Sequence, residues 1–192
     1  NVIFFQWLND ELSITPLPEL PIGLTSCNAV CIKDRLYVVG GNSGKTSLKS
    51  AFVMDLSETV KKWTGIGDMP IALENAVAAV CHDGESQKIF LLGGRYKLPG
   101  DKTTTYSDKV MKYDPKSNKW STFDFKNDNG EKLKLAAGTG VAISKNKIAI
   151  FGGDKGLIFN KIESFNNKLS QPDLEDREKV NNEKIGVLTS HM

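Results

Sequence analysis

The sequence lacks two features that would place it in a membrane or on a nucleic acid. No apolar run approaches the roughly 20 residues that a membrane-spanning helix needs. The 25 basic and 23 acidic residues are scattered through the 192-residue chain, without the basic stripe that neutralises phosphates. We therefore expect neither a membrane nor a nucleic acid as a partner.

Histidine and cysteine are also scarce, which removes most metal and disulfide chemistry. The two histidines, His82 and His191, have no cysteine near them at metal-ligand spacing. We predict no metal site and no cofactor. The three cysteines, Cys27, Cys31 and Cys81, are too few for a disulfide framework. Apolar neighbours place Cys31 and Cys81 in strands, and we expect buried thiols.

The start of the chain lacks both an initiator methionine and the basic region of a signal peptide. Because Asn1 to Trp7 already form an apolar, strand-like run, we expect a processed or excised segment. Any targeting signal would then be lost from view, so the residues themselves leave the compartment open.

An internal repeat is the strongest positive signal, because a period of about 40 to 50 residues is typical of propellers and solenoids. Each repeat has an apolar strand, a polar turn, a second apolar strand and a double glycine, at residues 28–41, 76–94 and 140–153. The first two repeats continue with a third strand and then a fourth strand around a tryptophan. In the first repeat these are residues 51–56 and Trp63, and in the second they are residues 108–113 and Trp120. This order predicts four antiparallel strands per repeat.

The double glycines and spaced aromatic residues resemble the kelch motif, which forms blades of a β-propeller. Glycine permits close backbone approach at a crowded strand end, and aromatic side chains fill the wedge between sheets. We therefore interpret the repeated residues as packing rather than as a site: Gly40, Gly41, Gly93, Gly94, Trp63 and Trp120.

Counting strands gives an all-β, kelch-type β-propeller fragment of two full four-stranded blades flanked by two half blades, over residues 1–156. Propellers usually close with about 4 to 8 blades, so we expect the rest of the chain or a second copy to complete the ring. Ile158, Ile162 and Phe165 have helical spacing and predict an amphipathic insertion over 157–168. We expect 169–192 to be a mobile linker or the start of the next segment.

Topology places the candidate site at one rim, because strand one begins where strand two ends in an antiparallel blade. The side chains at this rim offer amides, a hydroxyl and opposed charges, which suit a polyhydroxylated ligand. The rim residues are Asn28, Asn42, Asn75, Arg95, Thr139 and Asp154. The alternative is turn chemistry, since Asn and Asp often stabilise loops after glycine. Glu74 could act as an acid or base beside Asn75, or be an ordinary solvated carboxylate.

Three segments resemble the N-acetylneuraminate epimerases, or sialic acid mutarotases, and in particular their cyclically permuted relatives. They read KWTGIGDMP at 62–70, VMKYDPKSNKW at 110–120, and a double glycine followed by an IFN sequence at 152–160. The sequence departs from the family at Leu73, where an Arg is common, and at Thr139, which matches a family His.

The resemblance implies interconversion of N-acetylneuraminate anomers, without metal or nucleotide, by a protein secreted to the periplasm. It also implies that the catalytic Glu and Arg lie in a later blade outside this chain. We therefore expect this chain to be inactive alone. Arg95 is our candidate partner for the sialic acid carboxylate. The competing hypothesis is a non-catalytic kelch module whose loops bind a protein partner, because fold does not determine function.

Overall fold

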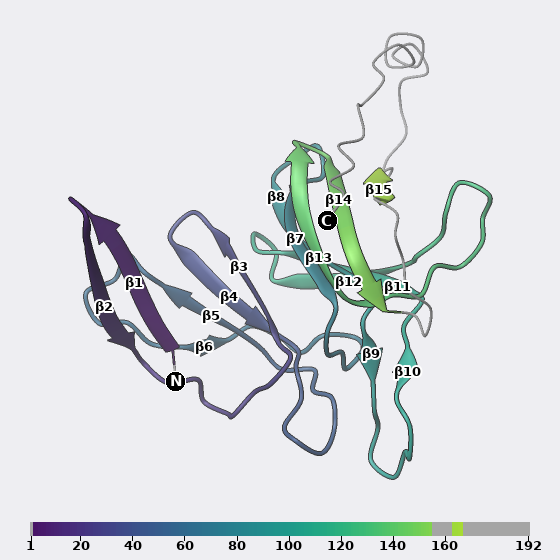
Figure 1. Cartoon of the computed structure of the whole chain (residues 1–192), viewed down its shortest axis with the longest axis horizontal. Helices are drawn as coiled ribbons and strands as arrows, with labels where there is room; N and C mark the ends of the chain where they lie inside the picture. The colour runs from purple at the N-terminus through teal and green to yellow at the C-terminus, as the bar shows by residue number, and fades with distance from the viewer. Residues whose placement is uncertain (1, 155–162, 167–192) are drawn as a thin grey trace, which may run out of the picture.

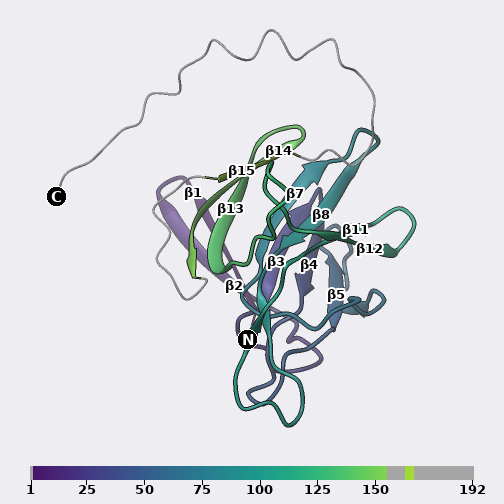
Figure 2. The same cartoon turned by 90° about the vertical axis from the view of Figure 1, so that its right-hand side faces the viewer.

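The computed structural model describes residues 2–154 and, as backbone, residues 163–166. The described residues form strands and loops, with no helix among them. Three sheets follow one another along the chain after an N-terminal hairpin; in Figure 1 the hairpin lies at the left, the first blade next to it, and the other two sheets together to the right of the first blade. Figure 2 shows the same sheets from the side. None of the described residues forms a helix long and apolar enough to cross a membrane.

The two predicted complete blades are confirmed. The hairpin pairs β1 (Val2–Leu8) with β2 (Glu11–Leu17). The first blade has the strands β3 (Asn28–Ile32), β4 (Arg35–Val39), β5 (Ala51–Asp55) and β6 (Thr64–Gly65). The second blade has β7 (Val77–His82), β8 (Gln87–Leu92), β11 (Lys109–Asp114) and β12 (Lys119–Asp124), and a short hairpin of β9 (Arg95–Tyr96) and β10 (Thr105–Tyr106) is inserted in it.

The third sheet differs from the predicted half blade by one strand. It contains β13 (Ala136–Ser144), β14 (Lys147–Asp154) and β15 (Glu163–Asn166) in that order. The helix predicted over 157–168 is wrong for Glu163–Asn166, whose backbone pairs with β14, because pairing satisfies the open edge of that strand. The remaining residues of that span, and the predicted linker at 169–192, lie outside the described residues.

Packing between blades follows from the two-residue period of a strand. In β8, Ile89 and Leu91 belong to the core shared with the first blade, whereas Phe90 and Leu92 belong to the core shared with the third sheet. All four side chains are buried, because β8 lies in a blade covered on both faces. This explains why the strand reads as a continuous apolar run.

Cysteine burial follows the same rule and corrects one expectation. Cys81 is buried, but Cys31 is exposed. Val30 and Ile32 point into the core between the first two blades, so Cys31 lies on the other face of β3.

The double glycines allow one blade to touch the next through backbone atoms. Gly40 and Gly93 have φ angles of 63° and 64°, in the region that favours glycine. A Cβ atom at Gly93 would lie 2.3 Å from the carbonyl oxygen of Leu135 in the following blade. The next N–H, from Gly94, donates to that same oxygen at 2.7 Å. Glycine is therefore required by a contact between blades, as the packing interpretation expected.

Each blade's tryptophan bonds to the segment that follows the preceding sheet. Trp63 donates from Nε1 to the Pro18 carbonyl at 2.9 Å, and Trp120 donates to the Gly67 carbonyl at 3.0 Å. The Trp120 ring also packs on Tyr113, with 4.9 Å between ring centroids. The repeated aromatic residues thus join neighbouring blades.

Candidate functional site

The strand ends that carry the double glycines also hold paired positions from each repeat. Register matches the residue after each double glycine with a residue just before or at the start of the first strand. These pairs are Thr25 with Asn42, Glu74 with Arg95, and Ala136 with Asp154. The blade fold therefore brings Asn42, Arg95 and Asp154 to one rim, in agreement with the topological argument. Side chains at these pairs can interact across neighbouring repeats.

A second set of equivalent positions links the blades through their backbones. Ser26, Asn75 and Ala137 all have positive φ, between 52° and 57°. The Asn75 N–H donates to the Ser26 carbonyl at 3.0 Å, and the Ala137 N–H donates to the Asn75 carbonyl at 2.8 Å. Asn75 suits this position because asparagine tolerates the left-handed region. Its role in the described structure is a turn and a link between blades.

Glu74 lies at the centre of the polar contacts on this rim. It is buried, with 7% of its surface exposed, and its backbone pairs with Arg95 through two hydrogen bonds of 2.8 and 2.9 Å. Asn42 donates from Nδ2 to Glu74 Oε2. The Gly44 N–H donates to Asn42 Oδ1 at 2.6 Å, which fixes the orientation of the amide.

Arg95 connects Glu74 to the third sheet. Its Nε lies 3.8 Å from Glu74 Oε1, and its Nη1 lies 3.8 Å from Asp154 Oδ2. Tyr106 of β10 donates its hydroxyl to Asp154 Oδ2 at 3.0 Å. We call Asn42, Glu74, Arg95, Tyr106 and Asp154 the rim cluster.

The rim cluster is loosely paired and partly exposed. The Arg95 Nε atom is buried without a hydrogen-bond partner among the described residues, and both Arg95 ion pairs are longer than a hydrogen bond. The Arg95 side chain is 29% exposed and that of Asp154 is 50% exposed. Carboxylate acceptors, an amide and a guanidinium at a partly open rim can bind hydroxyl groups and an acidic group.

The two remaining predicted site residues, like Asn75, do not belong to the rim cluster. Asn28 begins β3 and pairs with Val39, whereas Thr139 is an exposed residue inside β13 that pairs with Phe151. Within the described residues, neither side chain has a hydrogen bond or an ion pair to the cluster. Thr139 was expected at the start of its strand, but β13 begins at Ala136.

Two members of the cluster were missed or undervalued from the sequence. The sequence leaves Glu74 two alternative roles, an acid or base and an ordinary solvated carboxylate. Its pairing with Arg95 could have been predicted from the repeat, because Thr25 and Asn42 pair at the equivalent positions of the preceding repeat. Tyr106 had no such signal, because it lies in the β9–β10 hairpin, which the first blade lacks.

The second blade carries a different polar cluster at its opposite end. Lys88 is 2% exposed, and its ammonium lies 2.9 Å from Asp114 Oδ1 and 3.7 Å from Asp83 Oδ2. Lys112 approaches the same Asp83 oxygen at 3.3 Å. Burial opposes ionisation of Asp114, but hydrogen bonds from Lys88, the Lys116 N–H and Ser117 outweigh it and lower the pKa of Asp114 to about 2. We call Asp83, Lys88, Lys112 and Asp114 the Lys88 network.

Metal-ligating side chains are dispersed in the part of the chain that the structure describes. No three His, Cys, Asp or Glu residues within it are grouped so that they could hold a metal ion. The polar side chains of the rim cluster make hydrogen bonds and ion pairs with one another.

Comparison with known proteins gives the family and the fold. The sequence profile of the N-acetylneuraminate epimerase family matches residues 17–189. The N-acetylneuraminate epimerase of Brucella suis is 30% identical over 145 residues, which are 75% of this chain and 34% of that protein. The Haemophilus influenzae epimerase is 27% identical over 143 residues, covering 74% and 35%. The chain thus spans about a third of the length of these curated relatives.

Solved structures support the same architecture. The structure of YjhT matches with a TM-score of 0.59 and 22% identity over 71% of this chain and 36% of that one. A fungal alcohol oxidase in complex with copper matches with a TM-score of 0.56 and 19% identity, covering 74% and 30%. At these identities, the structural matches show the fold alone. Since the epimerase profile covers most of the sequence, this chain, a fragment of a kelch-type propeller, belongs to the N-acetylneuraminate epimerase family.

Proposed function

We propose that this chain forms part of a protein that interconverts the anomers of N-acetylneuraminate, and that it is inactive without the remaining blades. The observation that carries the proposal is the family match over residues 17–189, together with a polar rim cluster built by neighbouring repeats. We also propose a periplasmic or secreted location, from the family resemblance.

The rim cluster would contribute substrate contacts rather than the proton-transfer groups. Asp154 and Asn42 suit sugar hydroxyl groups, because carboxylate and amide groups can accept and donate hydrogen bonds there. Arg95 would bind the substrate carboxylate. Glu74 and Asp154 already flank the guanidinium, so a bound carboxylate would have to displace at least one of these weak pairs.

The decisive experiment measures exchange between the two anomers of N-acetylneuraminate by NMR. It compares this chain with the full-length protein from which it comes, at equal concentration. We expect acceleration by the full-length protein only. If neither accelerates exchange, the epimerase proposal is wrong and a non-catalytic module for a protein partner becomes the better hypothesis.

The role of Arg95 is tested in the full-length protein with Arg95→Gln. A substrate-binding role predicts that KM rises about tenfold, the effect of one lost charge-assisted hydrogen bond, while kcat changes little. Lys102→Gln, an exposed cation in the β9–β10 loop, is the matched control. An unchanged KM would remove Arg95 from the substrate site.

A further inference from the structure

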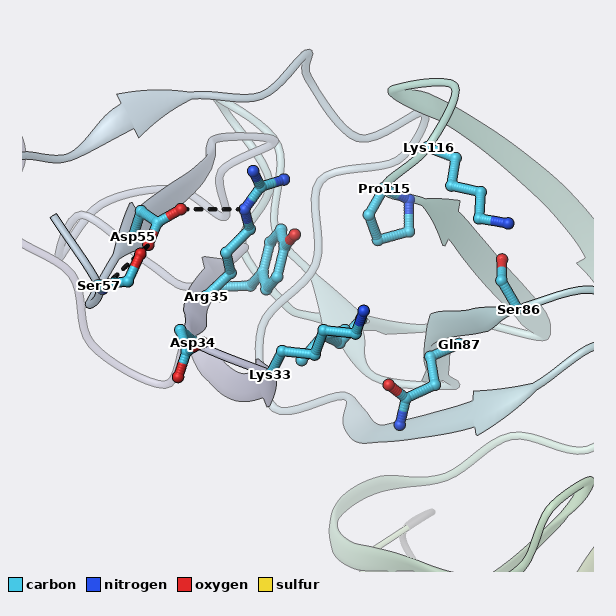
Figure 3. A pocket seen from close by; sticks show the side chains of 11 residues that line it. Lys33, Asp34, Arg35, Asp55, Ser57, Ser86, Gln87, Pro115 and Lys116 are labelled. Atoms are coloured by element: carbon cyan, nitrogen blue, oxygen red, sulfur yellow. Dashed lines mark hydrogen bonds and ion pairs between the residues drawn. The ribbon is translucent and has the colours of Figure 1, made fainter.

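A pocket lies at the end of the first two blades opposite the rim cluster. It has a volume of about 550 Å³, within the usual range for small-molecule sites. Figure 3 shows its walls, which come from the turns β3–β4, β7–β8 and β11–β12 and from the end of β5. All of these lining residues belong to the two complete blades.

The charges around the pocket leave two cations available. Lys33 and Lys116 line it, and within the described residues neither ammonium has a carboxylate within 4.0 Å. Arg35 is occupied, because its Nε lies 3.3 Å from Asp55. In Figure 3, Lys116 lies across the pocket from Arg35. Asp34 also lines the pocket.

The pocket also contains an unsatisfied hydroxyl and an apolar surface. Ser86 Oγ is buried and has no hydrogen-bond partner among the described residues. A buried polar group without a partner destabilises the fold, so an acceptor that reaches Ser86 would be favoured. Ile32, Tyr37 and Pro115 line the same pocket and offer contact to the organic part of a ligand.

We propose that this pocket binds a small phosphate monoester, with its phosphate between Lys33 and Lys116 and its organic part against Ile32, Tyr37 and Pro115. Two ammonium groups from different blades favour a dianion over a single carboxylate, because a phosphate offers three oxygens and nearly two charges. The volume exceeds what inorganic phosphate fills, which favours an ester.

The binding test uses ¹⁵N-labelled chain titrated separately with glycerol 3-phosphate, inorganic phosphate and glycerate. We expect saturable shifts of the Lys33, Ser86 and Lys116 amides, with glycerol 3-phosphate binding most tightly and a Kd on the order of 1 mM, the weak end of specific binding. Glycerate has a similar skeleton but carries a carboxylate. Equal binding of glycerate, or no saturation by glycerol 3-phosphate, would overturn the proposal.

Two variants separate a built site from general charge attraction. Lys33→Gln/Lys116→Gln should weaken binding at least about tenfold, as expected for lost charge-assisted hydrogen bonds. The control Lys62→Gln/Lys102→Gln makes the same charge change at exposed lysines outside the pocket and should leave Kd unchanged. An equal loss in both variants would show non-specific attraction and overturn the site.

Ser86→Ala provides a second, independent readout. It should weaken glycerol 3-phosphate binding several-fold without lowering the melting temperature, because the hydroxyl has no partner to lose among the described residues of the free protein. A lower melting temperature with unchanged Kd would show that Ser86 supports the fold rather than the ligand.

Discussion

The two ends of the second blade show two ways to arrange charge. The Lys88 network is closed: its buried ammonium has one contact of 2.9 Å, and Asp83 has a second cation in Lys112. The rim cluster is open: Arg95 lies 3.8 Å from both of its carboxylates. The first arrangement lies within one sheet and leaves little capacity for a ligand. The second connects repeats through long ion pairs of partly exposed side chains.

This difference separates charges that stabilise the fold from charges that can bind. A buried, hydrogen-bonded charge becomes costly when its partner is removed, whereas a partly exposed pair contributes little. Stability measurements on each end of the blade can therefore test which charges are structural and which remain available to a ligand.

The largest expected effect follows removal of the buried cation. Lys88→Met should lower the free energy of unfolding by about 4 kcal/mol, because Asp83 and Asp114 would lose a buried partner. Urea unfolding followed by tryptophan fluorescence measures it. Lys119→Met, at an exposed residue of the same sheet, is the control. Equal stability of the two variants would show that the network is not structural.

The next prediction concerns the backbone beneath the rim. Gly93→Ala should cost about 3 kcal/mol, from the left-handed conformation and from the contact with the Leu135 carbonyl. Gly152 is the matched control, because it has the same φ of 64° but a Cβ added there would meet no described atom within 4 Å. Gly152→Ala should cost only about 1–2 kcal/mol, the conformational part.

Comparing Gly93→Ala with Gly152→Ala separates the cost of the backbone conformation from the cost of the contact between blades. If both substitutions cost the same, conformation alone explains the double glycine and the contact between blades contributes nothing. If Gly93→Ala costs more, the rim has a tightly packed backbone under a loosely paired set of side chains.

Acid unfolding should depend on Asp114. Its folded pKa of about 2 lies below the unfolded value of roughly 4, so its stabilisation is complete above pH 4 and is lost as the pH falls toward 2. Asp114→Asn should lower stability at pH 7 by about 2 kcal/mol, the effect of hydrogen bonds to a charged group. It should also flatten the dependence between pH 4 and 2.

Urea unfolding at several pH values between 7 and 2.5 checks this prediction. Asp128→Asn changes an exposed carboxylate in the loop after β12 and is the control. A steep decline that persists in Asp114→Asn would assign acid sensitivity to another group and weaken the description of the Lys88 network as closed.

The fold could be predicted because its determinants repeat, whereas the site depends on residues that do not. Double glycines and tryptophans recur at blade contacts, so the strand order and the position of the rim follow from spacing. Tyr106 comes from the β9–β10 hairpin of the second blade, which has no counterpart in the first blade. Strand β15 was predicted as part of a helix, because the spacing of Ile158, Ile162 and Phe165 cannot reveal an open strand edge that needs a partner.

The smallest expected effect on stability is at Arg95. Arg95→Gln should change the free energy of unfolding by about 1 kcal/mol or less, because its ion pairs are long and partly solvated and Asn42 still donates to Glu74. Urea unfolding of the chain gives this value, and Lys88→Met measured in parallel gives the scale. A loss as large as that of Lys88→Met would make Arg95 a structural ion. A small loss, combined with the rise in KM expected for the full-length protein, would identify the open rim as the end of the blade that contacts the sugar-acid substrate.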